Sequence, residues 1–281
     1  MKRENTSKIR KLTLNEVQQE SFEILKAFHN YCVENNLRYQ LAYGTCLGAI
    51  RHKGFIPWDD DVDVMMPRPD FDRLNELIST QSIQNYELLS LRTSSIYSSP
   101  LAKIHNPSTL AEQQYYQLDV PQFGVYIDIF VVDGIPDQVV DQQLLFKKAF
   151  SARRKWELSI KRFGYEKNYL KRFLKVLLAL PFRLIGYRYW VEQYERISKT
   201  YIFNEQDYAG VVLFGEGQRK EIFKRSVFEE SVLKQFRDKE FYVPASYDTY
   251  LSQMYGDYMQ LPPEEQRISK HGTHFYDCPI Q

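Results

Sequence analysis

The chain has 281 residues, enough for one large domain or two modest ones. Hydrophobic residues make up 43% of the chain and aromatic residues 15%, so a sizeable core is expected. The formal net charge of +1 excludes a global electrostatic attraction to nucleic acid or membranes, so any such contact must come from a local patch. We therefore expect no nucleic-acid partner.

Neither end of the chain nor its cysteines suggests secretion. The first residues, MKRENTSKIRKL, lack the apolar core of a signal peptide, and no run of about 18 apolar residues could span a bilayer. The cysteines are scattered and odd in number: Cys32, Cys46 and Cys278. They predict neither a zinc site nor a disulfide framework and favour a reducing compartment. These features predict a cytoplasmic protein.

The first half of the chain alternates helices and strands. A capping box at Thr13–Glu16 opens a helix predicted over 14–35. A short helix should follow the Gly44-Thr45 turn, and another should cover 69–78. Strands are predicted over 38–43, 61–66, 86–91, 101–104 and 123–132. The last of these, FGVYIDIFVV, is the strongest strand signal, because it is rich in β-branched and aromatic residues. Residues 1–137 are therefore predicted to form an α+β catalytic core around a mixed sheet flanked by helices.

From 138 to 203 the pattern becomes helical and basic. Between Lys147 and Arg188, thirteen Lys or Arg stand against two Glu, and Pro181 is expected to break the helical run. Such a stretch is either an amphipathic surface that meets anionic lipid or an anionic polymer, or a solvated face over an ordinary core. Residues 204–281 form a third, mixed part that is expected to complete the active site.

Four aspartates fall within five positions: Asp59, Asp60, Asp61 and Asp63. Carboxylates this dense repel one another unless a cation lies between them. Valines alternate with the last two aspartates, so Asp61 and Asp63 should project from the same side of a strand. A calcium loop beginning at Asp59 is excluded, because Gly and Glu are missing from its sixth and twelfth positions. The pattern favours Mg²⁺, or alternatively Mn²⁺, over an acidic surface turn.

A third carboxylate is expected, because a metal-dependent phosphotransfer site usually needs three acidic groups. Asp128 is the only charged residue of the strand 123–132, and its isoleucine neighbours predict burial. The alternative is a carboxylate that faces water at a sheet edge. Asp133 is a weaker candidate, since the following Gly134 is typical of a turn. The predicted metal ligands are Asp61, Asp63 and Asp128.

Gly44 and Thr45 are expected to supply the other half of the site. Glycine lets the backbone approach a phosphate closely, and the helix that follows presents N–H groups. A Gly-Thr pair alone is not specific. A strand, Gly-Thr, a helix and then Asp-x-Asp on the next strand form a more specific combination.

This combination resembles the nucleotidyltransferase fold and, more narrowly, the LicD family. The resemblance rests on two blocks that bracket most of the chain, GTCLGAIRHKGFIPWDDDVD from Gly44 and YDTYLSQMYGDYMQLPPEEQR from Tyr247. Thr45 stands where the fold usually has Ser, and the hydroxyl is kept. The bacterial members of this family are phosphocholine transferases of the cell surface. Fukutin and fukutin-related protein are distant animal relatives, and their cysteine-rich zinc insertion has no counterpart here.

The resemblance implies Mg²⁺-dependent transfer of phosphocholine from CDP-choline to a sugar hydroxyl, with release of CMP. The acceptor would be a lipid-linked precursor of a teichoic acid or a related glycan at the inner membrane face, with the basic stretch 147–188 as docking surface. Asp128 or Asp59 would act as general base. The alternatives are another CDP-alcohol (glycerol or ribitol), a nucleotidyltransferase that uses a nucleoside triphosphate, and a non-enzymatic adaptor.

Basic and aromatic residues complete the predicted site. The candidates for phosphate contact are Arg51, His52, Arg68 and Lys103, whereas Lys53 is better explained as a solvent-facing charge. In the C-terminal block, Arg267 is expected to close over the site and Asp257 to hold structure. A choline head group needs aromatic faces, which Trp58 and either Tyr255 or Tyr258 would supply, unless these are chance neighbours.

Overall fold

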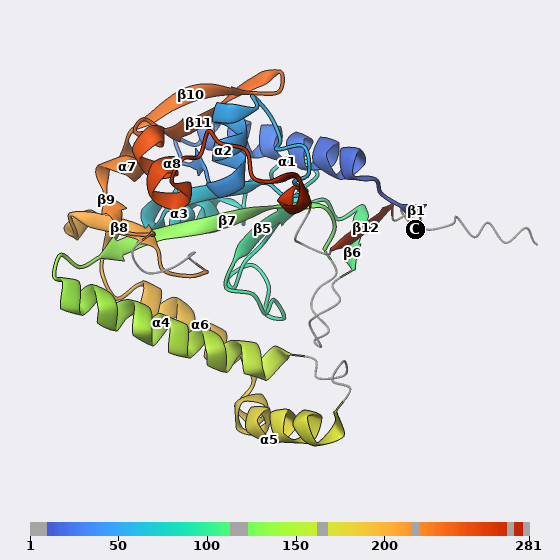
Figure 1. The fold of residues 1–281 in the computed structure, drawn as a ribbon, viewed down its shortest axis with the longest axis vertical. Helices are drawn as coiled ribbons and strands as arrows, with labels where there is room; N and C mark the ends of the chain where they lie inside the picture. Colours follow the sequence, from blue (N-terminus) through green and yellow to red (C-terminus); the bar gives the residue numbers. More distant parts are fainter. Residues whose placement is uncertain (1–9, 113–122, 162–167, 215–219, 269–272, 278–281) are drawn as a thin grey trace, which may run out of the picture.

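A mixed sheet forms the centre of the molecule, with helices packed around it (Figure 1). The computed structural model describes residues 10–112, 123–161, 168–214, 220–268 and 273–277. Among these, seven strands form the sheet in the order β2-β3-β7-β5-β4, and β8 and β9 extend it from β7. Their bounds are β2 Gln40–Leu41, β3 Asp63–Pro67, β4 Glu87–Leu89, β5 Ala102–His105, β7 Tyr126–Ile135, β8 Tyr208–Val211 and β9 Phe223–Lys224. Only β3 and β7 run parallel to each other among these paired strands.

The first helices follow from clear sequence signals. Helix α1, Leu14–Glu34, begins at the Thr13–Glu16 capping box, in which both reciprocal hydrogen bonds are present. Its apolar stripe includes Ile24, Leu25 and Phe28, all fully buried. Helix α2, Tyr43–Arg51, connects β2 to the loop before β3, and α3, Arg68–Leu77, follows β3 directly. These connections place the N-terminal end of α2 beside the start of β3.

The remaining small elements lie around this core. A three-stranded sheet joins β1 Arg10–Lys11, β12 His274–Asp277 and β6 Thr109–Glu112, and a hairpin joins β10 Ser231–Phe236 to β11 Lys239–Pro244. The short helices are α7 Ser226–Glu229, α8 Tyr247–Tyr255, η1 Phe203–Glu205 and η2 Glu264–Gln266. Because β8, β9 and α8 come from the last third of the chain, this part contributes both to the sheet and to its surroundings.

Three consecutive helices form a separate layer below the sheet in Figure 1: α4 Val139–Ile160, α5 Tyr169–Ile185 and α6 Tyr187–Ser198. Helices α4 and α6 pack on the sheet through two small apolar clusters, one of which includes Leu145, Tyr194 and Leu213. Helix α5 lies farthest from the sheet (Figure 1). None of the described helices is long and apolar enough to cross a membrane.

The predicted α+β architecture with a mixed sheet is confirmed, and several boundaries are corrected. Strand β7 continues to Ile135, so Asp133 is a strand residue and the predicted turn is wrong. Pro181 lies inside α5, and the helical run breaks instead at Gly186, where φ is +93°. The predicted division at 137 and 203 stays a prediction. Cys32 and Cys46 are buried free thiols, whereas Cys278 and residues 162–167 of the basic stretch lie outside the described residues.

Candidate active site

Three charged side chains stand in one row across the centre of the sheet. In the parallel pair β3–β7, Asp63 lies opposite Asp128. In the antiparallel pair β7–β5, Asp128 lies opposite Lys103. The Lys103 ammonium forms an ion pair with the Asp128 carboxylate, and both side chains are buried. The register of three adjacent strands therefore places two carboxylates and one ammonium side by side in a row.

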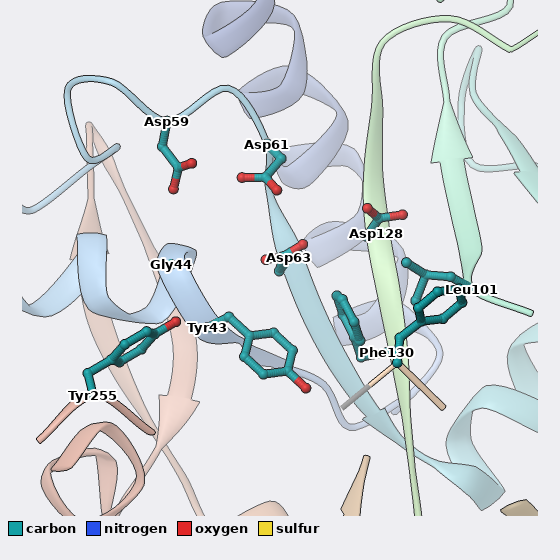
Figure 2. Close-up of a pocket in the computed structure, with 10 residues that line it drawn as sticks. Tyr43, Gly44, Asp59, Asp61, Asp63, Leu101, Asp128, Phe130 and Tyr255 are labelled. Carbon is teal, nitrogen blue, oxygen red and sulfur yellow. The ribbon is translucent and has the colours of Figure 1, made fainter. Parts of the chain in front are cut away.

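This row opens into a cavity of about 410 Å³. Its lining combines carboxylates with aromatic and apolar side chains: Tyr43, Gly44, Asp59, Asp61, Asp63, Leu101, Asp128, Phe130, Phe214 and Tyr255. Figure 2 shows the four carboxylates gathered on one side and the rings of Tyr43 and Phe130 on the other. The two rings are in edge-to-face contact, with centroids 4.7 Å apart. The cavity thus has an acidic wall and an aromatic wall.

The carboxylates of the acidic wall are close enough to influence one another's ionisation. Burial raises the pKa of Asp63 well above its usual range, and the nearby carboxylates of Asp61, Asp128 and Asp59 raise it further, while Lys103 lowers it. Burial also raises the pKa of Asp59. Lys103 is paired with Asp128, and Asp63 lies among three neighbouring carboxylates that raise its pKa, so a further cation would stabilise its ionised state.

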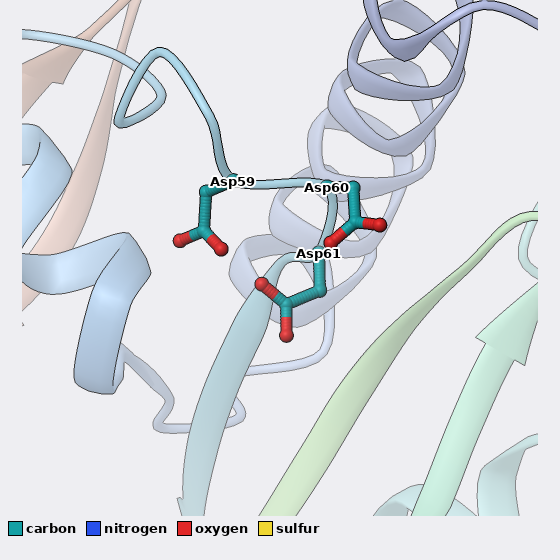
Figure 3. Close-up of side chains that lie close together, drawn as sticks. All are labelled: Asp59, Asp60 and Asp61. Atoms are coloured by element: carbon teal, nitrogen blue, oxygen red, sulfur yellow. The ribbon is translucent and has the colours of Figure 1, made fainter. Parts of the chain in front are cut away.

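The most compact acidic group lies in the loop that leads into β3. Asp59, Asp60 and Asp61 each offer an oxygen, and these three oxygens lie within 4.8 Å of one another (Figure 3). The predicted set Asp61, Asp63 and Asp128 lines the cavity, but Asp128 is engaged by Lys103. Asp61 precedes β3 instead of lying on it, although Asp61 and Asp63 both face the cavity as predicted (Figure 2).

The N-terminal end of α2 forms the floor beside these carboxylates. Gly44 is needed for a close approach, because a Cβ at this position would lie 2.8 Å from Oδ2 of Asp59. Tyr43 adopts a positive φ of 42°, which is rare for a residue with a side chain, and its N–H donates to the Tyr250 hydroxyl at 3.2 Å. Thr45 is buried, and its hydroxyl accepts from the N–H of Asp63 at 2.8 Å. Thr45 therefore holds the start of β3 in position and is not among the residues that line the cavity.

A second cavity of about 520 Å³ adjoins the first and shares Gly44, Asp59 and Tyr255 with it. It is lined by many residues of the predicted C-terminal block and by Trp58 and Arg51. Arg51 donates to the carbonyl oxygen of Tyr258 at 2.7 Å, so it fastens the C-terminal segment beside the site. Arg267 lies over the Trp58 ring, with its guanidinium carbon 5.9 Å from the ring centroid.

The structure gives the other aromatic and basic candidates different places. Tyr255 lines both cavities, and Tyr258 and Asp257 line the second. The Tyr258 hydroxyl donates to Asp248 at 2.7 Å. His52 caps the C-terminal end of α2, far along the helix from Gly44, and lines neither cavity. Lys53 is exposed, as expected for a solvent-facing charge.

Arg68 lies outside both cavities. Its guanidinium donates to both carboxylate oxygens of Asp133, at 2.7 and 2.9 Å, and to the Ser198 hydroxyl at 3.3 Å. Burial raises the pKa of Asp133, and Arg68 offsets part of this effect. The predicted phosphate contact for Arg68 is therefore replaced by a buried ion pair, because Arg68 follows the C-terminal end of β3 whereas the acidic row lies at its start.

Several cavity residues escaped the sequence analysis: Tyr43, Leu101, Phe130 and Phe214. Phe130 had a usable signal, since it is two positions after Asp128 on the same strand and must face the same side. Phe214 comes from a segment far along the chain that reaches the rim through tertiary packing, where its ring meets Trp156 of α4 at 5.5 Å. Nothing local in the sequence indicated this contact.

Strand β2, helix α2 and strand β3, with paired aspartates at the start of β3, form an arrangement that fits a group-transfer domain, and comparison with known proteins agrees. Residues 36–159 match the family described as LicD/FKTN/FKRP, nucleotidyltransferase domain. The lipopolysaccharide cholinephosphotransferase LicD of Haemophilus influenzae is 31% identical over 272 residues, which cover 94% of this chain and 97% of that protein. An uncharacterised protein of Rickettsia prowazekii is 37% identical over 57 residues, 20% of this chain and 21% of its own length. The chain belongs to the LicD family, and the prediction of a LicD-type transferase from its sequence is confirmed.

Proposed function

We propose that this chain is a cholinephosphotransferase that moves phosphocholine from CDP-choline to a sugar hydroxyl of a cell-surface glycan precursor, such as that of a teichoic acid. One observation carries the proposal: four aspartates and four aromatic residues line one cavity, and the rings of Tyr43 and Phe130 lie across it from the aspartates (Figure 2). A phosphocholine donor has the matching chemistry, because its diphosphate is anionic and its head group is a quaternary ammonium. We also assign the domain a nucleotidyltransferase-like fold, supported by the family match over residues 36–159.

The acidic wall fits a hard divalent cation. Its donors are all carboxylate oxygens, the ligands that Mg²⁺ and Mn²⁺ prefer, and burial together with the neighbouring carboxylates raises the pKa of Asp63, which a cation would counteract. We propose Asp61 and Asp63 as the principal ligands, with Asp128 as the third. A bound Mg²⁺ would neutralise charge on the donor diphosphate and on the leaving CMP.

The aromatic wall fits the head group. A quaternary ammonium is attracted to the faces of aromatic rings within about 6 Å. The rings of Tyr43 and Phe130 lie on the side of the cavity away from the aspartates (Figure 2), and Phe214 and Tyr255 also line the cavity. These residues replace Trp58 as the proposed choline contacts, because the Trp58 ring already has the Arg267 guanidinium over it. Lys103 holds Asp128 in place and adds positive charge beside the diphosphate.

The position of Asp59 suits a general base. Asp59 lines both cavities, so it lies between the proposed donor site and the second cavity, where we place the acceptor sugar. Its raised pKa makes its carboxylate a stronger base than an exposed aspartate. The acceptor oxygen attacks the phosphorus that carries choline and passes its proton to Asp59. The bond from that phosphorus to the bridging oxygen breaks, and CMP leaves with this oxygen.

The experiment compares donors. Purified protein with Mg²⁺ is incubated separately with CDP-choline, CDP-glycerol, CDP-ribitol, CTP and ATP, each with amino-sugar acceptors of the teichoic-acid and lipopolysaccharide types. CMP from CDP-choline alone supports the proposal. CMP from another CDP-alcohol would change the head group, and pyrophosphate from a triphosphate would overturn the reaction class. Asp63→Asn serves as the inactive comparison, and Asp137→Asn, which alters an exposed aspartate, serves as the matched control.

A further inference from the structure

Helix α5 exposes an unusually apolar surface. Ten of its large apolar side chains are exposed, from 37% for Val176 to 84% for Tyr169. The single buried residue of the helix is Ala179. A soluble helix ordinarily turns its apolar stripe toward a core. In α5 the small Ala179 faces the protein, and the large apolar residues face outward.

The polar and apolar residues separate cleanly around the helix axis. At about 100° per residue, Lys171, Lys175, Ala179, Arg172 and Arg183 fall within one arc of roughly 120°. The exposed apolar residues fill the remaining arc of roughly 200°, with Phe173, Leu177 and Leu184 near its middle. The cations therefore stand on both margins of the apolar face, two lysines on one side and two arginines on the other.

The helix and its nearest sequence neighbours carry basic residues without acidic ones. From Lys167 to Val191 the sequence contains no Asp or Glu. An apolar arc of this width is broader than the stripe of about 100° by which a helix usually contacts a protein core. It suits a lipid surface, where apolar side chains enter the acyl region while lysine and arginine reach the headgroup phosphates.

The helix is nevertheless fixed to the rest of the molecule. The Asn168 side chain caps its first turn by accepting from the N–H groups of Leu170 and Lys171. At the other end, the Trp190 indole of α6 donates to the Phe182 carbonyl oxygen at 3.0 Å, and the two rings meet at 5.5 Å. Figure 1 shows α5 beyond α4 and α6, on the far side from the sheet. The apolar arc thus lies at an outer surface of the molecule, and α6 contacts the C-terminal part of the helix.

We propose that α5 is an interfacial anchor that lies in the surface of a bilayer containing anionic phospholipid, with the arc around Phe173, Leu177 and Leu184 inserted. Four cations border this arc, and the helix itself carries no Asp or Glu. The anchor holds the enzyme at a membrane and is independent of which donor or acceptor the active site uses.

Flotation of the purified full chain with vesicles tests the anchor. The chain should float with vesicles of phosphatidylglycerol and phosphatidylethanolamine, more weakly with phosphatidylcholine vesicles, and less as salt increases. The triple variant Phe173→Ser/Leu177→Ser/Leu184→Ser should partition roughly 100-fold more weakly. The matched control Val139→Ser/Val140→Ser/Leu144→Ser changes three exposed apolar residues of α4 and should float like the wild type.

A site-specific label gives a second readout that does not depend on a triple substitution. In a chain that carries Cys278→Ser, an environment-sensitive dye at Leu177→Cys should shift to the blue with anionic vesicles, and the same dye at Val140→Cys should not. Equal flotation of the α5 triple variant and the wild type would overturn the proposal. So would a wild type that does not float but forms a dimer which the α5 triple variant abolishes, because a second copy would then cover this face.

Discussion

Two buried carboxylates lie five positions apart on the same strand and serve different ends. Asp128 and Asp133 both belong to β7, and each is paired with one cation. Their odd spacing turns them to opposite faces of the sheet. Asp133 is 1% exposed and is held by both arms of the Arg68 guanidinium. Asp128 forms an ion pair with the Lys103 ammonium and faces a cavity that contains three more aspartates.

The difference separates a structural ion pair from one that borders the proposed active site. The Arg68–Asp133 pair is bidentate, and Ser198 accepts a further hydrogen bond from Arg68, so the charges compensate each other. In the row Asp63–Asp128–Lys103, neighbouring carboxylates raise the pKa of Asp63, and the open cavity gives a ligand access to the row. Burial and a cation partner therefore do not identify an active site. A cluster of carboxylates beside an open cavity is the better indicator of an active site.

The largest expected effect on activity comes from removing the charge of Asp63, which lines the cavity. Asp63→Asn should lower kcat/KM for CMP release by roughly 1,000-fold or more, because it removes a proposed metal ligand. The same change should raise the melting temperature without metal. The pKa of the Asp63 carboxyl is raised in the fold, so its ionised form destabilises the native state at neutral pH. A variant that keeps full activity would exclude Asp63 from the site.

Disruption of the Arg68–Asp133 pair should lower folding stability and leave activity almost unchanged. Arg68→Met leaves the Asp133 carboxylate buried without its partner, which typically costs about 3–5 kcal/mol of folding free energy. Chemical denaturation measures this loss, and activity per folded molecule should change little. Arg68→Lys is the matched control and should recover part of the stability. If Arg68→Met instead raised KM for the donor and left stability unchanged, Arg68 would contact phosphate as its sequence position first suggested.

The error about Asp133 has a physical origin in Gly134. A glycine after an aspartate is typical of a turn. In the structure, a Cβ on Gly134 would lie 2.7 Å from the carbonyl oxygen of Ile202, so the glycine allows a later segment to pack closely against β7. A glycine at this position is compatible with a turn and also with close packing of another segment. Only the tertiary structure shows that close packing is the reason here.

The acidic wall was easier to predict from the sequence than the aromatic wall, because local patterns identify its residues. Alternation within one segment brought Asp61 and Asp63 to one side, and the lone charge of a strongly apolar strand singled out Asp128. The aromatic wall joins residues from α2, β7 and the segment after β8, and strand register and tertiary packing bring them together. Periodicity within β7 would have been sufficient to place Phe130 on the side of Asp128, although the residue was missed. To place Phe214, one would have to know how α4 packs on the sheet.

Lys103 offers a sharper test of the difference between the two pairs. Lys103→Met leaves four carboxylates around the cavity without their ammonium, so it should lower stability by about 1–3 kcal/mol without metal. Mg²⁺ should then raise the melting temperature of this variant more than that of the wild type, because the cation replaces the lost charge. Thermal unfolding with and without Mg²⁺ measures both effects. The absence of any Mg²⁺ response in either protein would contradict the proposed metal site.

The smallest expected effect concerns the glycine beneath Asp59. Gly44→Ala places a methyl group 2.8 Å from Oδ2 of Asp59 in the present geometry, so the carboxylate must move. Because the contact is with the end of a side chain, folding stability should change little. Displacement of a proposed base should lower kcat/KM by about 10-fold, or ~1.4 kcal/mol in the barrier. Gly54→Ala is the matched control, since its methyl group would meet only Arg237, with Cγ at 3.5 Å, an ordinary contact. Equal activity of the two variants would show that the position of Asp59 does not limit the reaction, and Asp128 would then be the remaining candidate for the base.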